Sequence, residues 1–257
     1  MAGDAALYVV STPIGHLGDL THRAEEVLRA VDVIYAEDTR RARILLRHYG
    51  IDTPCVSYRE RNEAARAAEA RRRWAAGASV ALVADAGTPL VSDPGLRLVR
   101  AAIDDGVPVV PVPGPSAVLA ALVASGLDPE PFTFYGFLPR RGRARAARIE
   151  ELRGLPHTAV FFESPERLVA TLDELAEALG GDRRVVVGRE LTKVHEEFVR
   201  GTLAETAAYY RRRSVRGEVV VCLAGATRAG PAAEREAEAR RHAETLARRG
   251  ASARQIA

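Results

Sequence analysis

The chain has 257 residues, of which 47% are hydrophobic and 28% charged, and its formal net charge is +3. A chain of this length can bury one large core or two cores of about 110–130 residues each. No apolar run approaches the roughly 18 residues that span a bilayer, and no basic segment precedes the apolar start. We therefore expect a cytoplasmic protein with no membrane partner. Cys55 and Cys222 lie far apart in apolar runs, which favours free thiols and no metal site.

The first half alternates short β-branched runs with helical patterns, as is typical of a parallel α/β sheet. Strands are predicted at 6–10, 32–36, 54–58, 79–84 and 107–112. Asp93 and Pro94 are predicted to be the N-cap and first residue of the helix that ends at Gly106. An apolar helix from Ser116 to Gly126 completes this half.

The second half is less regular, with predicted strands at 132–137, 158–163, 183–188, 196–201 and 218–224. Neighbouring strands without a helix between them indicate antiparallel pairs, and therefore a mixed sheet. We predict an N-terminal α/β domain at 1–117, a C-terminal α/β domain at 118–228 and a charged helical tail at 229–257. A new helix is predicted to begin at Ser252, so we interpret the tail as truncated.

Three loops rich in small residues follow strands of the first half. They are Ser11-Thr12-Pro13-Ile14-Gly15, Asp85-Ala86-Gly87-Thr88-Pro89 and Pro113-Gly114-Pro115-Ser116. Ligands of parallel sheets collect at the carboxyl ends of the strands, and Gly and Pro let a rigid backbone approach them closely. Each loop alone is compatible with a plain turn. Three on one rim predict a ligand site.

Several familiar sites are excluded by their missing residues. The chain has neither the Gly-Lys-Ser/Thr of a P-loop nor any G-x-G of a dinucleotide loop. The segment 114–118 lacks the second glycine of a nucleophile elbow. His195-Glu196 lacks the second histidine of a zinc protease helix.

Six segments, in order, resemble the ribosomal RNA small subunit methyltransferase I family of the tetrapyrrole-methylase-like superfamily. They are "LYVVSTPIGHLGDLTHRAEEVLRAVDVIYAEDTRRARILLRHYGI", "VALVADAGTPLVSDPG", "PVPGPSAVLAALVASG", "FYGFLPR", "FFESPERL" and "RELTKVHEEFVRGTL", within residues 6–225. The resemblance implies a two-domain α/β fold, with a mostly parallel N-terminal sheet, a mixed C-terminal sheet and the cofactor cleft between them. It implies a homodimer that uses S-adenosylmethionine to 2′-O-methylate a cytidine in the decoding region of 16S rRNA in the small ribosomal subunit.

The resemblance also assigns the S-adenosylmethionine contacts, most of them in the three small-residue loops. These positions are Ser11, Thr12, Pro13, Asp85, Ala86, Gly87, Thr88, Ser116, Ala117, Phe162 and Ala224. Asp85 is the most specific of them, although a buried N-cap of the next turn is its alternative role.

A ribose hydroxyl is a poor nucleophile, so we expect a base, or a cation that stabilises the developing alkoxide. The candidates are Glu37 and Asp38, which follow the second strand on the same rim, and Glu190 with Lys193. Lys193 is the only lysine of the chain, and a lysine can accept a proton where an arginine cannot. A surface ion pair with Glu196 or Glu197 is the alternative for Lys193.

The segment 137–148 combines Phe137 with a run of arginines. The predicted RNA contacts are Arg140, Arg141, Arg143 and Arg145 from this segment, together with Arg40. Such a cluster can bind phosphates with salt-dependent affinity, but a solvated helix face is the alternative.

Two other functions compete with rRNA methylation. The first is a methylase that acts on a tetrapyrrole or a protein side chain. The second is a non-catalytic RNA-binding ribosome-assembly factor.

Overall fold

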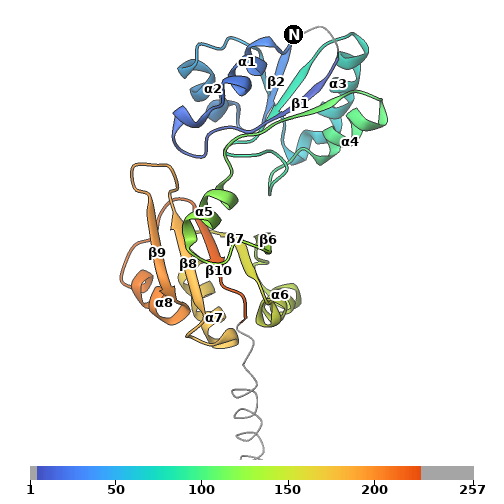
Figure 1. Ribbon diagram of the computed structural model, residues 1–257. Coiled ribbons are helices and arrows are strands. Elements are labelled where there is room, and N and C mark those ends of the chain that lie inside the picture. The colour runs from blue at the N-terminus through green and yellow to red at the C-terminus, as the bar shows by residue number, and fades with distance from the viewer. Residues whose placement is uncertain (1–4, 227–257) are drawn as a thin grey trace, which may run out of the picture.

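The computed structural model describes residues 5–226, so the predicted tail at 229–257 lies outside the described residues. These residues form two five-stranded sheets in two bodies that follow one another along the length of the molecule (Figure 1). All ten predicted strands are present between residues 5 and 226. In that range, no helix combines the length and the apolar character needed to cross a membrane.

The first sheet is entirely parallel, as predicted. Its strands, in spatial order, are β3 (Cys55–Ser57), β2 (Val33–Ala36), β4 (Val80–Val83), β1 (Leu7–Val10) and β5 (Val109–Val112). Alternate side chains of a strand point to opposite faces, so both faces are apolar and both are covered by helices. One face carries α1 (His22–Ala30) and α2 (Thr39–His48), and the other carries α3 (Glu63–Ala75) and α4 (Leu96–Asp104).

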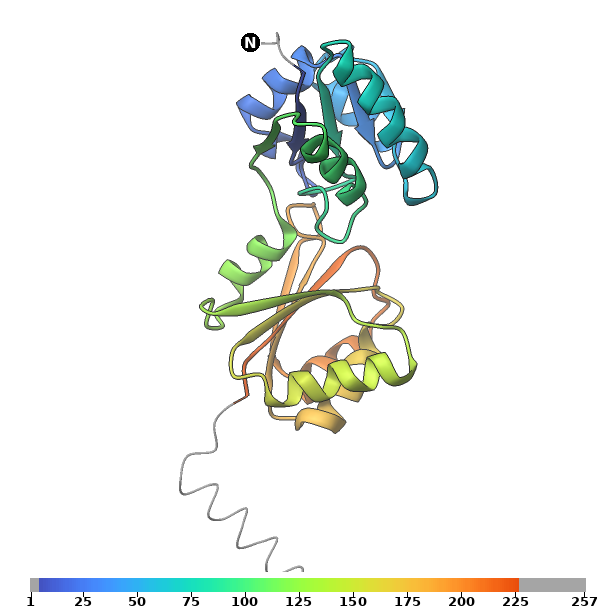
Figure 2. The same cartoon turned by 90° about the vertical axis from the view of Figure 1, so that its right-hand side faces the viewer.

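The second sheet is mixed, as predicted, because only β6 and β7 run parallel. Its strands, in spatial order, are β6 (Phe132–Phe137), β7 (Thr158–Glu163), β10 (Val219–Leu223), β8 (Arg184–Arg189) and β9 (Glu197–Thr202). One face is covered by α6 (Gly142–Gly154), α7 (Leu168–Leu179) and α8 (Leu203–Arg211). The opposite face is covered by α5 (Ala117–Ser125) (Figure 2).

The helix α5 follows the first sheet in sequence but packs on the second. Val118 and Leu122 of α5 share an apolar cluster with Val160, Val186 and Val220. Ile14, from the loop after β1, belongs to the same cluster. This packing places α5, from Ala117 onward, with the second body and joins the β1 loop to it. The division between residues 117 and 118 stays a prediction.

One helix begins later than the sequence predicts. Asp93 and Pro94 do not start α4, because the helix begins at Leu96 with Gly95 as its N-cap. Gly95 has a φ of 140°, a conformation that favours glycine, and its amide donates to the Glu63 carboxylate at 3.0 Å. This contact with the start of α3 fixes the helix terminus and leaves the Asp93 side chain free of a capping role.

Candidate active site

The three small-residue loops meet at the carboxyl edge of the first sheet. Thr12 and Gly87 exchange backbone hydrogen bonds of 2.9 and 3.0 Å. The Ser11 and Thr88 hydroxyls lie 2.9 Å apart, and the Thr88 hydroxyl donates to the Pro115 carbonyl at 3.2 Å. A Cβ on Gly114 would lie 3.0 Å from the Ser11 Cβ. The loops after β1, β4 and β5 therefore form one rigid backbone unit.

A cavity of about 380 Å³ opens beside this unit, between the two sheets. Its walls come from the β4 loop, the start of α5 and the ends of strands of the second sheet. The predicted cofactor residues on its wall are Asp85, Ala86, Gly87, Thr88, Ser116, Ala117 and Phe162. Strands of the second sheet and the residues next to them contribute Phe137, Glu163, Ser164, Pro165 and the segment 217–220. A cavity of this size falls within the range of about 300–1,000 Å³ that is usual for small-molecule sites.

Four predicted cofactor residues lie elsewhere. Ser11 and Thr12 are buried behind the cavity wall, where their hydrogen bonds hold the loops together. Thr12 and Pro13 line a separate cavity of about 120 Å³, which is too small for a nucleoside. Ala224 follows the far end of β10, where its amide donates to the Arg184 carbonyl at 2.9 Å. Ala224 is not on the wall of the larger cavity, which β10 reaches with its first residues, so its cofactor contact stays a prediction.

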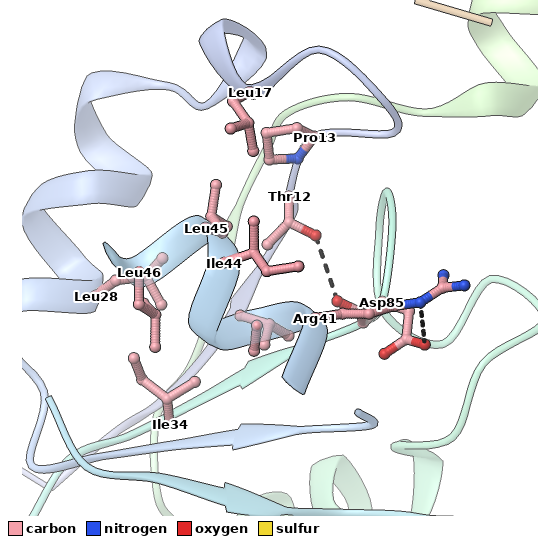
Figure 3. A pocket seen from close by; sticks show the side chains of 13 residues that line it. Thr12, Pro13, Leu17, Leu28, Ile34, Arg41, Ile44, Leu45, Leu46 and Asp85 are labelled. Carbon is pink, nitrogen blue, oxygen red and sulfur yellow. Dashed lines mark hydrogen bonds and ion pairs between the residues drawn. The ribbon is translucent and has the colours of Figure 1, made fainter. Parts of the chain in front are cut away.

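Figure 3 shows the smaller cavity, whose apolar wall includes Leu28, Ile34 and Leu46, with Asp85 and Arg41 at one side. Arg41 and Asp85 line the larger cavity too. The Arg41 Nε lies 3.7 Å from Asp85 Oδ2, and Asp85 Oδ1 accepts a hydrogen bond of 2.8 Å from the Asp38 amide. Asp85 thus ties the β4 loop to the β2 loop. It caps no turn of its own, so the alternative predicted for it does not apply.

The two acidic residues after β2 differ in environment. Asp38 is the N-cap of α2 and accepts hydrogen bonds from the Arg40 amide at 2.9 Å and from its guanidinium at 2.7 Å. These hydrogen bonds hold the Asp38 pKa well below its ordinary value, which makes Asp38 a poor base. Burial, followed by the charge of Asp85, raises the pKa of Glu37. Neither residue is on the wall of the larger cavity.

Asp93, which sequence reasoning treated only as a helix cap, lies on the wall of the larger cavity. Burial and the nearby charges of Glu37 and Asp85 raise its pKa to about 7. A carboxyl group with such a pKa exchanges a proton near neutral pH. The sequence signal was available, since Asp93 follows the loop after β4 on the same rim as Asp85. The Asp-Pro pattern, however, predicts a helix start more strongly than a site.

The turn at 190–193 is a structural clamp. Lys193 Nζ donates to Glu190 Oε1 at 2.8 Å and to Glu218 Oε2 at 2.9 Å. Burial alone would lower the Lys193 pKa, but the hydrogen bonds and charges of these two glutamates outweigh it and raise the pKa. Burial alone would raise the Glu190 pKa, but the hydrogen bonds from Lys193 and the Glu218 amide outweigh it and lower the pKa. The structure thus offers neither residue as a proton acceptor, and the partners of Lys193 are not the predicted Glu196 and Glu197.

The predicted RNA contacts divide into two groups. Arg140, Arg141 and Arg143 are exposed at the start of α6 and take part in none of the ion pairs found among residues 5–226. Arg40 is exposed but pairs with Asp38. Arg145 is only 8% exposed and donates to Glu174, Thr171 and the Pro139 carbonyl. Its predicted phosphate contact is wrong for this structure, because its guanidinium is buried between α6 and α7.

Two solved methyltransferases have the same arrangement of sheets. A cobalt precorrin-4 methyltransferase superposes with a TM-score of 0.64 at 19% identity, covering 85% of this chain and 94% of that chain. A uroporphyrin-III C-methyl transferase from Thermus thermophilus, complexed with S-adenyl homocysteine, has a TM-score of 0.61 at 22% identity, covering 86% and 97%. The fold of this chain is thus that of the two-sheet methyltransferases.

The sequence narrows this class to a family. Residues 6–207 match the family described as Tetrapyrrole (Corrin/Porphyrin) Methylases, and the chain belongs to it. It is 51% identical over 221 residues to the "Ribosomal RNA small subunit methyltransferase I" of Mesorhizobium japonicum, covering 86% of this chain and 75% of that protein. The protein of the same name from Micromonospora olivasterospora is 49% identical over 256 residues, covering 99% and 81%.

Proposed function

We propose that this protein transfers a methyl group from S-adenosylmethionine to the 2′-hydroxyl of a cytidine in 16S rRNA, within the decoding region of the small ribosomal subunit. The observation that carries the substrate class is the 46–51% identity to relatives named for methylation of small-subunit ribosomal RNA. We place the enzyme in the cytoplasm, where ribosomal subunits are assembled.

The residues of the larger cavity fit S-adenosylmethionine. Ile14, Val118 and Phe162 give it apolar surface for an adenine ring, and the carboxylate of Asp85 suits a cation. Backbone approaches closely at Gly87, where a Cβ would lie 3.3 Å from Ile14 Cγ2 and φ is +81°. When bound, the cofactor supplies a methyl group on a positively charged sulfur. The chain's own contribution is to orient the donor and acceptor and to manage one proton.

The RNA is proposed to approach over the end of β6. Phe137 is 55% exposed and lies on the cavity wall, with its ring centroid 5.5 Å from that of Phe162. The exposed Arg140, Arg141 and Arg143 follow three to six residues later. An aromatic face suits a nucleobase, and free guanidinium groups suit the phosphates on either side of it.

The proposed homodimer is supported by an apolar surface on α5. Leu119 is 51% exposed and Val123 is 77% exposed, and residues four apart lie on one side of a helix. The inward side of α5 already packs on the second sheet. A second copy of this chain is the proposed partner of the outward side.

The test of the proposed function is transfer of labelled methyl groups to small ribosomal subunits that lack the modification, followed by mapping of the labelled nucleotide. We expect label on the ribose of one cytidine of the 16S rRNA. Label on a base, or label in uroporphyrinogen or a protein but not in RNA, would contradict the proposal. Naked 16S rRNA, tested in parallel, shows whether the assembled subunit is the substrate.

A further inference from the structure

The cavity wall contains one carboxylate that has no partner. Four carboxylate side chains line the cavity, those of Asp85, Asp93, Glu163 and Glu218. Asp85 binds the Asp38 amide, Glu163 is paired with Arg167 and accepts from Thr171 at 2.7 Å, and Glu218 is held by Lys193. Among residues 5–226, no hydrogen bond or ion pair involves the Asp93 carboxylate. Of the four, Asp93 alone has no protein partner among the described residues.

The loop that carries Asp93 is held in one conformation. Leu90 and Ser92 have φ values of 72° and 70°, which non-glycine residues adopt only when the surroundings impose them. A Cβ on Gly95 would lie 2.7 Å from Leu82 Cδ2, and one on Gly136 would lie 3.1 Å from Ser92 Oγ. The loop is therefore wedged between β4 and β6, which fixes the position of Asp93 in the cavity.

The charges around Asp93 keep it able to accept a proton near neutral pH. Glu37 at the end of β2 and Asp85 at the end of β4 act on it as like charges, in addition to burial. The cations nearby are already paired, since Arg41 of α2 is with Asp85 and Lys193 is with Glu218. On the β7 side, Glu163 is paired with Arg167. No described cation neutralises Asp93, so its carboxylate keeps its basicity.

We propose that Asp93 is the general base that removes the proton of the ribose 2′-hydroxyl, an assignment that rests on the proposed function. The hydroxyl proton passes to the Asp93 carboxylate as the ribose oxygen forms a bond to the methyl carbon. The carbon–sulfur bond breaks with its electron pair remaining on sulfur, which leaves S-adenosylhomocysteine. Asp93 then releases the proton to water. The four residues predicted from the sequence are off the cavity wall, and three of them serve as a cap or a clamp.

The experiment is single-turnover methyl transfer to unmodified small subunits at saturating cofactor, measured from about pH 5.5 to 8.5. The variants are Asp93→Asn, Glu37→Gln, and Asp104→Asn as a matched control on exposed surface of α4. Calorimetric affinity for S-adenosylhomocysteine and the melting temperature are measured for each. Asp93→Ser replaces Asp93→Asn if the latter unfolds.

For the wild type we expect a rate that increases with pH and levels off above about pH 7. Asp93→Asn should lose about 10²- to 10⁴-fold in rate, together with the pH dependence. Its affinity for S-adenosylhomocysteine should stay within about threefold of the wild type, because a general base adds little to ground-state binding. Asp104→Asn should match the wild type throughout.

Three results would overturn the assignment of Asp93. Asp93→Asn could keep the wild-type rate and pH profile. It could lose affinity for S-adenosylhomocysteine with an unchanged rate at saturation, which would make Asp93 a cofactor contact. The pH step could vanish in Glu37→Gln instead. If the wild type itself labels no RNA, the proposed function fails first, whatever the variants do.

Discussion

At the residue scale, the free Asp93 carboxylate has a consequence for stability. Its pKa rises from an ordinary value of 3.8 to about 7 on folding. The folded state therefore binds a proton more tightly than the unfolded state does. The contribution of Asp93 to stability is fully present below pH 3.8 and is lost as the pH rises through 7. Above that pH, the folded protein holds a half-buried, unpaired charge.

We predict that Asp93→Asn raises the melting temperature at pH 8, because the amide cannot ionise. For a chain of this size, the melting temperature should rise by about 2–4 °C for each kcal/mol added to the free energy of unfolding. At pH 5, where the folded wild type holds Asp93 protonated, the gain should be smaller. Calorimetric scans of both proteins at the two pH values measure this. An equal shift at both pH values would contradict it and would point to packing instead of titration.

Lys193 shows why a lysine stands where an arginine would otherwise be expected. Its Nζ lies within 2.9 Å of both Glu190 and Glu218, and its stem passes so near Gly15 that a Cβ there would lie 2.4 Å from Lys193 Cγ. A compact ammonium group with three donors can bridge two carboxylates in such a space, whereas a planar guanidinium needs more room. The single lysine is thus explained by local geometry.

At the scale of elements, the β1 loop and the turn at 190–193 are in direct contact. The Gly15 position faces Leu191, Thr192 and Lys193, and the His16 amide donates to the Thr192 hydroxyl at 3.0 Å. Glu190 and Thr192 have φ values of 51° and 64°. The turn therefore has a strained backbone conformation where it contacts the β1 loop, and it cannot easily move away from Gly15.

We predict that Gly15→Ala destabilises the protein by about 1–3 kcal/mol, because the added methyl group overpacks this contact. It should also weaken binding of S-adenosylhomocysteine, since displacement of the turn moves Glu218 on the cavity wall. Gly154→Ala is the matched control, because a Cβ there meets nothing within 4 Å. Chemical denaturation and calorimetry measure both effects. Equal stability of the two variants would show that the turn at 190–193 accommodates the added methyl group without cost.

The start of α6 presents the second element-level prediction. Arg140, Arg141 and Arg143 are exposed, so replacing all three by Gln should raise KM for the small subunit and leave kcat and cofactor affinity unchanged. Each lost phosphate contact should reduce the slope of log affinity against log salt by about 0.7–0.9. The control removes the same charge from the exposed Arg23, Arg47 and Arg72. An identical salt slope in both triple variants would mean that only net charge matters.

Elements and site residues were predictable to different degrees. The β-branched runs predict the strands, and a parallel sheet necessarily brings its loops to one edge, so the cluster at Asp85 to Thr88 follows from the sequence. Arg145 is spaced four and seven residues from the buried Ile149 and Leu152, a helical spacing that could have indicated its burial. Asp93 was missed because a long-range hydrogen bond from Gly95 to Glu63 moved the helix start.

At the scale of the whole molecule, one side of the cavity wall could not be placed from the sequence. This side is formed by β6, β7 and the start of β10, which pair with strands far away in sequence. They supply Phe137, Glu163 and the segment 217–220. Local patterns identify such strands but do not give their order in a mixed sheet. Their placement opposite the β4 loop depends on α5, which turns the chain from the first sheet onto the second.

The proposed homodimer gives the prediction for the whole assembly. Leu119→Asp combined with Val123→Asp places two charges on the outward side of α5, where a stable interface of about 800 Å² per partner would have to desolvate them. We expect this variant to sediment as a monomer with an unchanged melting profile of the isolated subunit. Ile103→Asp on α4 is the control, because Ile103 is 63% exposed on a different helix and should leave the dimer intact. A dimer that persists in the α5 variant but dissociates in Ile103→Asp would move the interface to α4, and a wild type that sediments as a monomer would remove it altogether.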